Sequence, residues 1–332
     1  MESLKIGVLG NGSWATAIVK MLSENTTEIG WYIRTAYTLE YLKIHKHNPK
    51  YIPQIEFNTD QLFLSNDINE IVEYADYLII AIPSAFLKPE LDKISVPLRE
   101  KVIFSAVKGI IPENLMILGE YLMAEYGMDK KQLGVIAGPC HAEEVAMERL
   151  SYLTVAAGKK LHAKNLAALL QSHYIKTTLS KDVHGIEWAA VLKNIYAIAA
   201  GVAHGLGYGD NFQAVLVSNA IREMNRFIKK NVDKKKRNIM RSAYLGDLLV
   251  TAYSTFSRNR LFGNMIGKGY TVKSAMMEMT MVAEGYYATK SAYIINERRG
   301  KARIPIISAM YEILYENKPA KEVMRTLTGY LD

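Results

Sequence analysis

The chain has 332 residues, which is more than one ordinary domain and indicates two. Hydrophobic residues make up 49% and charged residues 22%, values that exclude disordered, collagen-like and low-complexity proteins. Lysine and arginine number 41 against 33 aspartate and glutamate. The resulting net charge of +8 fits nucleic acid, an anionic membrane or a phosphorylated small molecule as the partner.

Cysteine usage and the apolar runs bear on location. A single cysteine excludes a disulfide framework and a multi-cysteine metal site, so we expect an intracellular protein without a metal centre. The first apolar run, Leu4 to Leu9, is too short for the core of a signal peptide. The longest, Trp188 to Ala203, contains Lys193 and falls short of the roughly 20 apolar residues that span a membrane. We therefore expect a buried helix there, and a cytoplasmic protein without membrane insertion.

Residues 1–180 alternate short apolar runs with helical stretches such as Trp14 to Ser23 and Asn114 to Tyr126. The apolar runs are nearly continuous in valine, isoleucine, leucine and alanine, which is typical of buried strands. They are Lys5–Leu9, Glu28–Ile33, Tyr77–Ile82, Val102–Val107, Leu133–Ala137 and Leu153–Ala157. Alternation of strand and helix predicts a doubly wound parallel sheet, an α/β fold.

Residues 181–332 lose the strand pattern and carry long apolar-periodic stretches instead, which predicts an all-helical second domain. The stretches are Val183–His204, Gln213–Lys229, Leu248–Phe256, Val272–Met281 and Ile307–Tyr315. The boundary near residue 180 depends only on this change of period, because no linker composition marks it.

A glycine-rich turn follows the first strand: Gly10-Asn11-Gly12-Ser13-Trp14-Ala15. Gly10 allows a tight turn, and Gly12 allows close approach of the backbone to a pyrophosphate. The pyrophosphate would lie at the positive N-terminus of the next helix. The spacing alone is weak, but a strand before it and a helix after it favour a Rossmann-like dinucleotide-binding domain over 1–180.

The end of the second strand bears on the choice of dinucleotide. Sites that prefer NAD usually have an acid there for the ribose 2′-hydroxyl. Ile29 through Leu39 contains no acid but does contain Arg34, whose guanidinium suits a 2′-phosphate. The alternative is an ordinary solvated arginine. We expect NADPH to be preferred, with NAD possible.

Lys193 lies alone in an apolar helical stretch. No acid occurs between Glu187 and Asp210, so it has no partner one turn away. Burial favours the neutral form of a lysine, which can accept a proton. The alternatives are a side chain that reaches solvent and one that pairs with a distant carboxylate.

Further polar groups stand at element ends. Asp247 precedes an apolar stretch, where a helix N-cap is the plain alternative. Ser257, Arg258 and Asn259 supply hydroxyl, guanidinium and amide donors suited to phosphate, unless they form only a polar turn. Lys108 and the run from Gly138 to Ala142 follow predicted strands, where doubly wound folds bind ligands.

Taken in order, these motifs resemble the bacterial-type NAD(P)-dependent glycerol-3-phosphate dehydrogenase family over nearly the whole chain. The shared motifs are Gly-Asn-Gly-Ser-Trp-Ala at 10–15, Asn-Pro-Lys-Tyr-Ile-Pro at 48–53, Pro-Ser at 83–84, Lys-Gly at 108–109, Gly-Pro at 138–139, Leu-Lys-Asn at 192–194, Gly-Asp-Leu at 246–248, Ser-Arg-Asn-Arg at 257–260 and Glu-Gly at 284–285. Each motif alone is weak, and the ordered set is specific.

The resemblance implies reversible reduction of dihydroxyacetone phosphate to sn-glycerol 3-phosphate, which supplies phospholipid synthesis. It makes Lys193 the acid/base, with Lys108 and Asp247 orienting the substrate. The implied substrate contacts are Lys108, Gly138, Cys140, Lys193, Asn194, Asp247, Thr251, Ser257, Arg258 and Asn259. The implied cofactor contacts are Gly10, Gly12, Ser13, Trp14, Arg34, Phe86, Lys108, Ala142, Arg258, Val282 and Glu284. A homodimer is also expected, and Phe86 has a core aromatic as its alternative.

Three departures from the family pattern concern the wall of the substrate pocket. Cys140 stands where the family usually has serine or threonine, and a thiol is the weaker hydrogen-bonding group. Asn219 stands where the family commonly has arginine, and Ala243-Tyr244 replaces small residues. We expect an altered pocket wall and the same reaction class.

Two other functions compete. A phosphogluconate-like dehydrogenase also combines a Rossmann domain, a helical domain and a Lys-Asn pair, but Ser257 to Arg260 disfavours it. A dinucleotide-sensing, nucleic-acid-binding regulator would use Lys229 to Arg241, which holds seven basic residues and one acid. That run has no aromatic residue for stacking, so we expect a solvated segment and no nucleic-acid partner.

Overall fold

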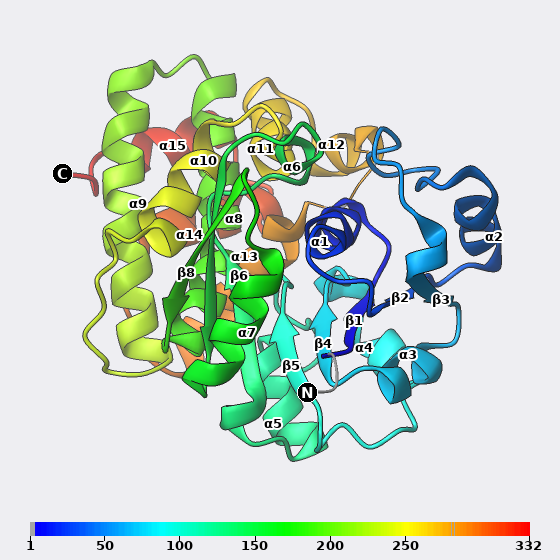
Figure 1. Cartoon of the computed structure of the whole chain (residues 1–332). Coiled ribbons are helices and arrows are strands. Elements are labelled where there is room, and N and C mark those ends of the chain that lie inside the picture. Colours follow the sequence, from blue (N-terminus) through cyan, green and yellow to red (C-terminus); the bar gives the residue numbers. More distant parts are fainter. Residues whose placement is uncertain (1–3, 280, 282) are drawn as a thin grey trace. The chain divides into compact units, whose positions relative to one another are not determined.

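The computed structural model describes residues 4–279, 281 and 283–332 (Figure 1). The chain forms two compact units. The first comprises Met1–Val107 and Met116–Val183, and the second comprises Lys108–Leu115 and His184–Asp332. The short segment that begins at Lys108 therefore leaves the sheet unit and belongs to the helical one.

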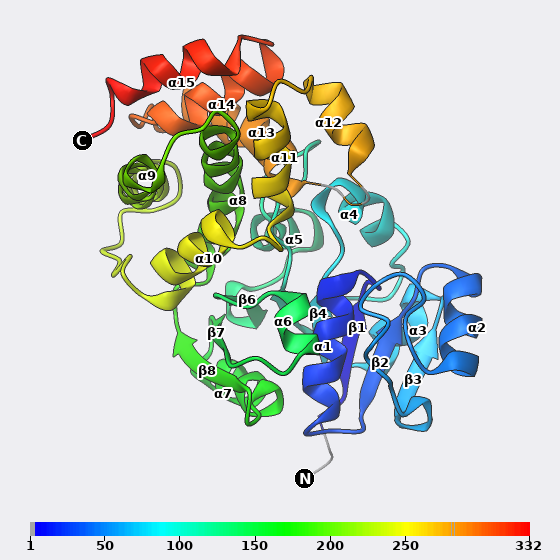
Figure 2. The same ribbon diagram turned by 90° about the horizontal axis from the view of Figure 1, so that it is seen from above.

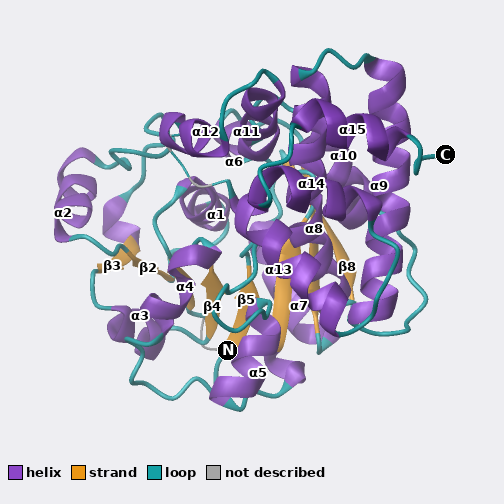
Figure 3. Ribbon diagram, turned by 180° about the vertical axis from the view of Figure 1, so that it is seen from behind, coloured by secondary structure: helices purple, strands orange, loops and turns teal. Residues whose placement is uncertain are grey.

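One eight-stranded sheet, drawn in orange in Figure 3, forms the centre of the first unit. Its spatial order is β3-β2-β1-β4-β5-β6-β7-β8. The strands are β1 (Ile6–Leu9), β2 (Ile29–Tyr32), β3 (Leu62–Ser65), β4 (Tyr77–Ile80), β5 (Val102–Ser105), β6 (Leu133–Ala137), β7 (Ser151–Ala157) and β8 (Ile175–Ser180). All six predicted strands are present, and the doubly wound α/β fold is confirmed.

The predicted parallel sheet contains one antiparallel pair. Six of the seven neighbouring pairs are parallel, but β6 and β7 are antiparallel, with Val135 opposite Ala156. A run of apolar residues specifies that a strand is buried and carries no information about its direction.

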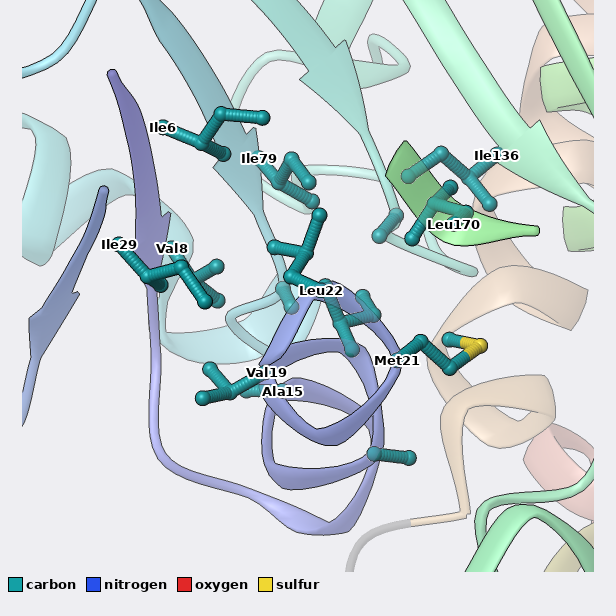
Figure 4. Packing of buried hydrophobic residues seen from close by; sticks show 14 of the residues in the cluster. Ile6, Val8, Ala15, Val19, Met21, Leu22, Ile29, Ile79, Ile136 and Leu170 are labelled. Carbon is teal, nitrogen blue, oxygen red and sulfur yellow. The ribbon is translucent and has the colours of Figure 1, made fainter. Parts of the chain in front are cut away.

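Helices cover the sheet, and α1 (Ser13–Ser23) is the one that positions the glycine turn. Ala15, Ile18, Val19 and Leu22 follow the three-and-four spacing of one helix face, and all are fully buried. Figure 4 shows this face gathered against side chains of β1, β2 and β4. The other helices are α2 (Ala36–His45), α3 (Ile68–Tyr74), α4 (Ser84–Leu91), α5 (Leu118–Tyr126), α6 (Ala142–Ala146) and α7 (Lys160–Leu170).

The second unit is built around α8 (Val183–Gly205), with other helices on several sides of it (Figure 2). The other helices of this unit are α9 (Asp210–Asn231), α10 (Asp247–Tyr253), α11 (Arg258–Gly267), α12 (Val272–Glu278), α13 (Glu284–Arg298), α14 (Pro305–Tyr315) and α15 (Ala320–Thr328). Among the described residues, α8 alone is long and apolar enough to cross a membrane, yet its apolar window is wholly buried inside the protein. The prediction of a buried helix here is confirmed.

A carboxyl group in this helical core holds the start of α14. Glu223 of α9 is fully buried and accepts hydrogen bonds from the backbone N–H groups of Ile306 (2.8 Å) and Ile307 (3.0 Å). Burial raises the pKa of Glu223 to about 7, although these two N–H groups and Arg226 act in the opposite direction. Desolvation therefore outweighs the hydrogen bonds.

We predict that Glu223 makes the free energy of unfolding fall as the pH rises between about 4.5 and 7. Because the folded state binds the Glu223 proton more tightly than the unfolded state, this stabilisation is complete at low pH and is lost as the pH rises through the folded pKa. The full change is on the order of 3 kcal/mol. Urea unfolding across this range should show the trend in the wild type and a weaker one in Glu223→Gln, and identical profiles would contradict it.

Candidate functional site

The turn between β1 and α1 has the geometry of a phosphate-binding loop. Gly10 has φ of 121°, and a Cβ atom there would lie 2.8 Å from the carbonyl oxygen of Ala81. Gly12, the N-cap of α1, has no atom within 4 Å of the position that its Cβ would occupy. An open backbone at the N-terminus of an eleven-residue helix fits a pyrophosphate group.

Two residues outside the predicted set hold this turn in place. The indole Nε1 of Trp31 donates to the carbonyl oxygen of Gly10 at 2.8 Å. The amide Nδ2 of Asn48, which is fully buried, donates to Asn11 O at 2.9 Å and to the hydroxyl of Thr16 at 3.0 Å. The signal for Asn48 was present in the sequence, because this residue opens the Asn-Pro-Lys-Tyr-Ile-Pro motif.

Arg34 and Phe86 come together at the surface of the first unit. Arg34 follows β2 and is exposed, and its guanidinium carbon lies 6.0 Å from the centre of the Phe86 ring. Phe86, in α4, is itself 45% exposed, so it is not the core aromatic that was its alternative. A cation held against an aromatic face retains its charge for an anionic ligand.

The loop after β6 carries three further predicted residues. Gly138 has φ of 137°, and a Cβ atom there would lie 2.6 Å from the carbonyl oxygen of Tyr152. Cys140 forms no disulfide and is 3% exposed, and Ala142 is the first residue of α6. The tight backbone explains why glycine begins this loop, and the thiol has little access to solvent.

In the second unit, Lys193 and Asp247 form a buried ion pair. Nζ of Lys193, from α8, donates to Oδ1 of Asp247, from α10. Their side chains are 4% and 2% exposed. The partner of Lys193 is therefore the distant carboxylate that was one alternative for this lysine. Removal of either charge would leave the other buried and uncompensated.

Neighbouring groups on the same helices are also fixed by hydrogen bonds. Nδ2 of Asn194 donates to the backbone carbonyl oxygen of Lys108 at 2.9 Å. The hydroxyl of Thr251 donates to the carbonyl oxygen of Asp247 at 2.6 Å. These bonds join α8 to the 108–115 segment and fix the first turn of α10.

Asp247 follows a turn of π-helix, Ser242–Gly246. Such a turn inserts one extra residue into the helical path and is frequent at functional sites. Tyr244, one of the departures from the family pattern, lies in this turn and is 3% exposed. Asp247 is the first residue of α10, and Gly246 takes the N-cap position that the sequence offered as the alternative role for Asp247.

Ser257, Arg258 and Asn259 form the N-terminus of helix α11, so the alternative of a plain polar turn was wrong. Ser257 is the N-cap, and its hydroxyl accepts from the backbone N–H of Arg260 at 3.3 Å. Arg258 is partly exposed, whereas Asn259 is buried. A ten-residue helix that begins with a guanidinium and an amide has the donors and the dipole direction that an anion requires.

Asn259 also joins α11 to α13. Its Oδ1 accepts from the backbone N–H of Gly285 at 2.9 Å, and this contact is buried. A Cβ atom at Gly285 would lie 2.6 Å from the carbonyl oxygen of Asn194. Because Gly285 has no side chain, the start of α13 can contact the backbone of α8 at Asn194, the residue after Lys193.

The predicted site residues divide between the units. The first unit holds Gly10, Gly12, Ser13, Trp14, Arg34, Phe86, Gly138, Cys140 and Ala142. The second holds Lys108, Lys193, Asn194, Asp247, Thr251, Ser257, Arg258, Asn259 and Glu284. Val282 lies outside the described residues.

Two further expectations concern metals and Asn219. The described residues contain no group of three or more histidine, cysteine, aspartate or glutamate side chains able to hold a metal ion.

Asn219, one of the departures from the family pattern, donates from Nδ2 to Asp332 O at 2.8 Å and accepts from Arg222 at 2.8 Å. Its amide is therefore engaged by these two residues.

Both halves of the chain match one protein family. Residues 5–163 match the family described as NAD-dependent glycerol-3-phosphate dehydrogenase N-terminus, and residues 182–325 match its C-terminus. The chain is similar to a protein of Agathobacter rectalis named glycerol-3-phosphate dehydrogenase [NAD(P)+], with 35% identity over 97% of this chain and 95% of that protein. A protein of Macrococcus caseolyticus with the same name is 33% identical, over 98% of this chain and 97% of that protein.

Solved structures show the same fold. The crystal structure of glycerol-3-phosphate dehydrogenase from Coxiella burnetii superposes with a TM-score of 0.89 and 25% identity, covering 98% of this chain and 99% of that one. A D-mandelate dehydrogenase solved with NADH is similar in fold alone, with a TM-score of 0.62 and 14% identity. The match covers 95% of this chain and 98% of that one.

We predict that Gly285→Ala lowers the free energy of unfolding by about 1–3 kcal/mol, because the added methyl group must separate α13 from the backbone of α8. Gly209→Ala is the matched control, since no atom lies within 4 Å of the position that its Cβ would occupy. Urea unfolding of the three proteins measures the difference. Equal effects of the two substitutions would contradict the close approach at Gly285.

Proposed function

The chain belongs to the NAD-dependent glycerol-3-phosphate dehydrogenase family, and on this premise we propose that it interconverts dihydroxyacetone phosphate and sn-glycerol 3-phosphate. The observation that carries the proposal is the buried ion pair of Lys193 and Asp247. A nicotinamide dinucleotide, when bound, supplies or removes the hydride at C2 of the substrate. The protein must then bind the phosphate and move one proton.

Lys193 is the proposed acid and base. In the reduction, the Nζ ammonium donates a proton to the C2 oxygen as the carbonyl becomes a hydroxyl. In the oxidation, the neutral amine takes that proton from the C2 hydroxyl. Asp247 holds Nζ in one position and balances its charge in a site from which water is excluded. Asn194 and Thr251, fixed by Lys108 and Asp247, support the orientation of the substrate.

The N-terminus of α11 is the proposed phosphate site. The guanidinium of Arg258 supplies charge-assisted hydrogen bonds. Because Oδ1 of Asn259 accepts from Gly285, the Nδ2 group is the part of this amide that a phosphate can use. Binding the non-reacting phosphate orients the carbon that reacts. Lys108, Gly138 and Cys140 remain predicted substrate contacts; at Cys140 the backbone is the stronger donor.

The proposed cofactor is NADPH, and NAD is the dinucleotide that the enzyme uses less readily. The exposed Arg34 guanidinium against Phe86 supports this preference, as does the absence of an acid from Ile29 to Leu39. The open backbone at Gly12 supports binding of the pyrophosphate by α1. The family resemblance assigns further cofactor contacts to Ser13, Trp14, Ala142 and Glu284, and it supports a cytoplasmic homodimer.

We predict that the wild type oxidises NADPH when dihydroxyacetone phosphate is added, and that Lys193→Ala lowers kcat by at least about a hundredfold because proton transfer is lost. Binding of NADPH, followed by its fluorescence, should be unchanged. Lys193→Arg keeps a cation beside Asp247 but cannot give up its proton, so it tests proton transfer in a folded protein. Folded wild type without turnover on any three-carbon phosphate would refute the proposed function.

We predict that Arg34→Ala raises KM for NADPH about tenfold or more, since a charge-assisted hydrogen bond to the 2′-phosphate is lost. KM for NADH should change little. Lys43→Ala is the control, because Lys43 is an exposed cation on α2 that pairs with Glu40. Equal changes for both dinucleotides would contradict a contact with the 2′-phosphate.

A further inference from the structure

Two basic segments that are distant in the sequence meet where α9 and α13 end. Nδ2 of Asn231, the last residue of α9, donates to Oδ1 of Asn296 in α13 at 3.0 Å. Because Gly300 has no side chain, its backbone packs closely against Asn231 and the carbonyl oxygen of Lys230. Nε of Arg226 donates to Arg303 O at 3.2 Å. We call the exposed cations of residues 229–241 and 298–303 the joint basic surface.

The segment after α9 contributes the first half of this surface. It follows α9 as the yellow-green loop at the left of Figure 1. Lys229, Lys230 and the run Lys234–Lys236 are all exposed. The acid of this segment, Asp233, forms an ion pair with Arg237 at 2.7 Å and a longer one with Lys235 at 3.7 Å. One carboxylate cannot neutralise this number of cations.

The segment after α13 contributes the second half. Arg298, Arg299, Lys301 and Arg303 are exposed within six residues, and Glu297 precedes them. Cations in the last turn of a helix stabilise its negative end, which accounts for those at the ends of α9 and α13. Lys301 and Arg303 lie beyond the end of their helix, as Lys234–Lys236 do beyond α9, so helix capping does not account for them.

An exposed apolar side chain lies in the same loop. Met240 is 66% exposed and stands beside the exposed Arg241. Cations together with an apolar side chain are the groups that bind the interface of an anionic membrane. Single-stranded nucleic acid would need several aromatic rings on which successive bases stack. In 226–241 and 296–303, all of them described, the one aromatic residue is the fully buried Phe227. Tyr330, whose carbonyl oxygen accepts from Arg303 at 3.3 Å, adds a single exposed ring.

We propose that the joint basic surface docks this protein reversibly on membranes rich in anionic lipid. The docking is peripheral, with lysine and arginine at the lipid phosphates and Met240 in the interface. It needs both segments and none of the residues assigned to substrate or cofactor.

The test is sedimentation of the wild-type protein with vesicles at low salt. One set of vesicles contains phosphatidylcholine alone and the other about one third phosphatidylglycerol, an anionic lipid. Binding is expected for the second set only, with loss at high salt. Lys234→Gln/Lys235→Gln/Lys236→Gln should weaken it about fivefold for each lysine removed. Arg298→Gln/Arg299→Gln should weaken it by the same factor per residue.

The matched control is Lys159→Gln/Lys160→Gln/Lys164→Gln, which removes three exposed lysines elsewhere in the chain. It should bind the anionic vesicles as the wild type does, and all variants should keep wild-type kcat and KM. Equal weakening by the control would refute a localised surface. Failure of the wild type to bind, or tighter binding to single-stranded RNA at the same salt, would refute membrane docking. An unchanged affinity of the arginine variant would refute the joint surface.

Discussion

The close contact of α8 with α11 is the constraint on which the second unit depends. A Cβ atom at Gly201 of α8 would lie 2.1 Å from the carbonyl oxygen of Arg260, and one at Gly263 of α11 would lie 2.1 Å from that of Ile198. No side chain fits at these distances, so the two backbones touch directly. The contact fixes the helix that carries Lys193 against the helix whose N-terminus carries Arg258, and their proposed roles require a constant separation.

The buried ion pair depends on this rigid frame. Withdrawal of Lys193 and Asp247 from water is costly, and their attraction offsets that cost only if the geometry is maintained. The π-helical turn before Asp247 and the bond from Thr251 to its backbone carbonyl oxygen fix the backbone that carries the carboxylate, while the buried length of α8 holds the lysine. A pair that adds little net stability can still be retained for the proton transfer that we propose for Lys193.

Much of the fold could be predicted from local patterns, and the failures occur where contacts between segments distant in the sequence decide the structure. The apolar runs predicted β1 and β4 because those strands are buried on both faces. The strands β3 and β8 lie at the edges of the sheet and are only partly buried. In β8 the apolar residues are separated by a lysine and two threonines, and in β3 the apolar run is only three residues long. Helix α11 contains arginines, asparagines and glycines, and its packing against α8 stabilises a helix that its composition does not favour.

In the candidate site, too, features set by consecutive residues could be predicted, and contacts between distant residues could not. The glycine turn could be predicted because strand, turn and helix are consecutive in the chain. The isolation of Lys193 was also visible, whereas its partner is 54 residues away and no helical spacing connects them. The sequence did contain one non-local signal, the repeated spacing of Gly201 with Gly205 and of Gly263 with Gly267. Two helices with small residues four apart can approach backbone to backbone. This spacing could therefore have paired α8, which carries Lys193, with α11, which carries the proposed phosphate-binding residues Arg258 and Asn259.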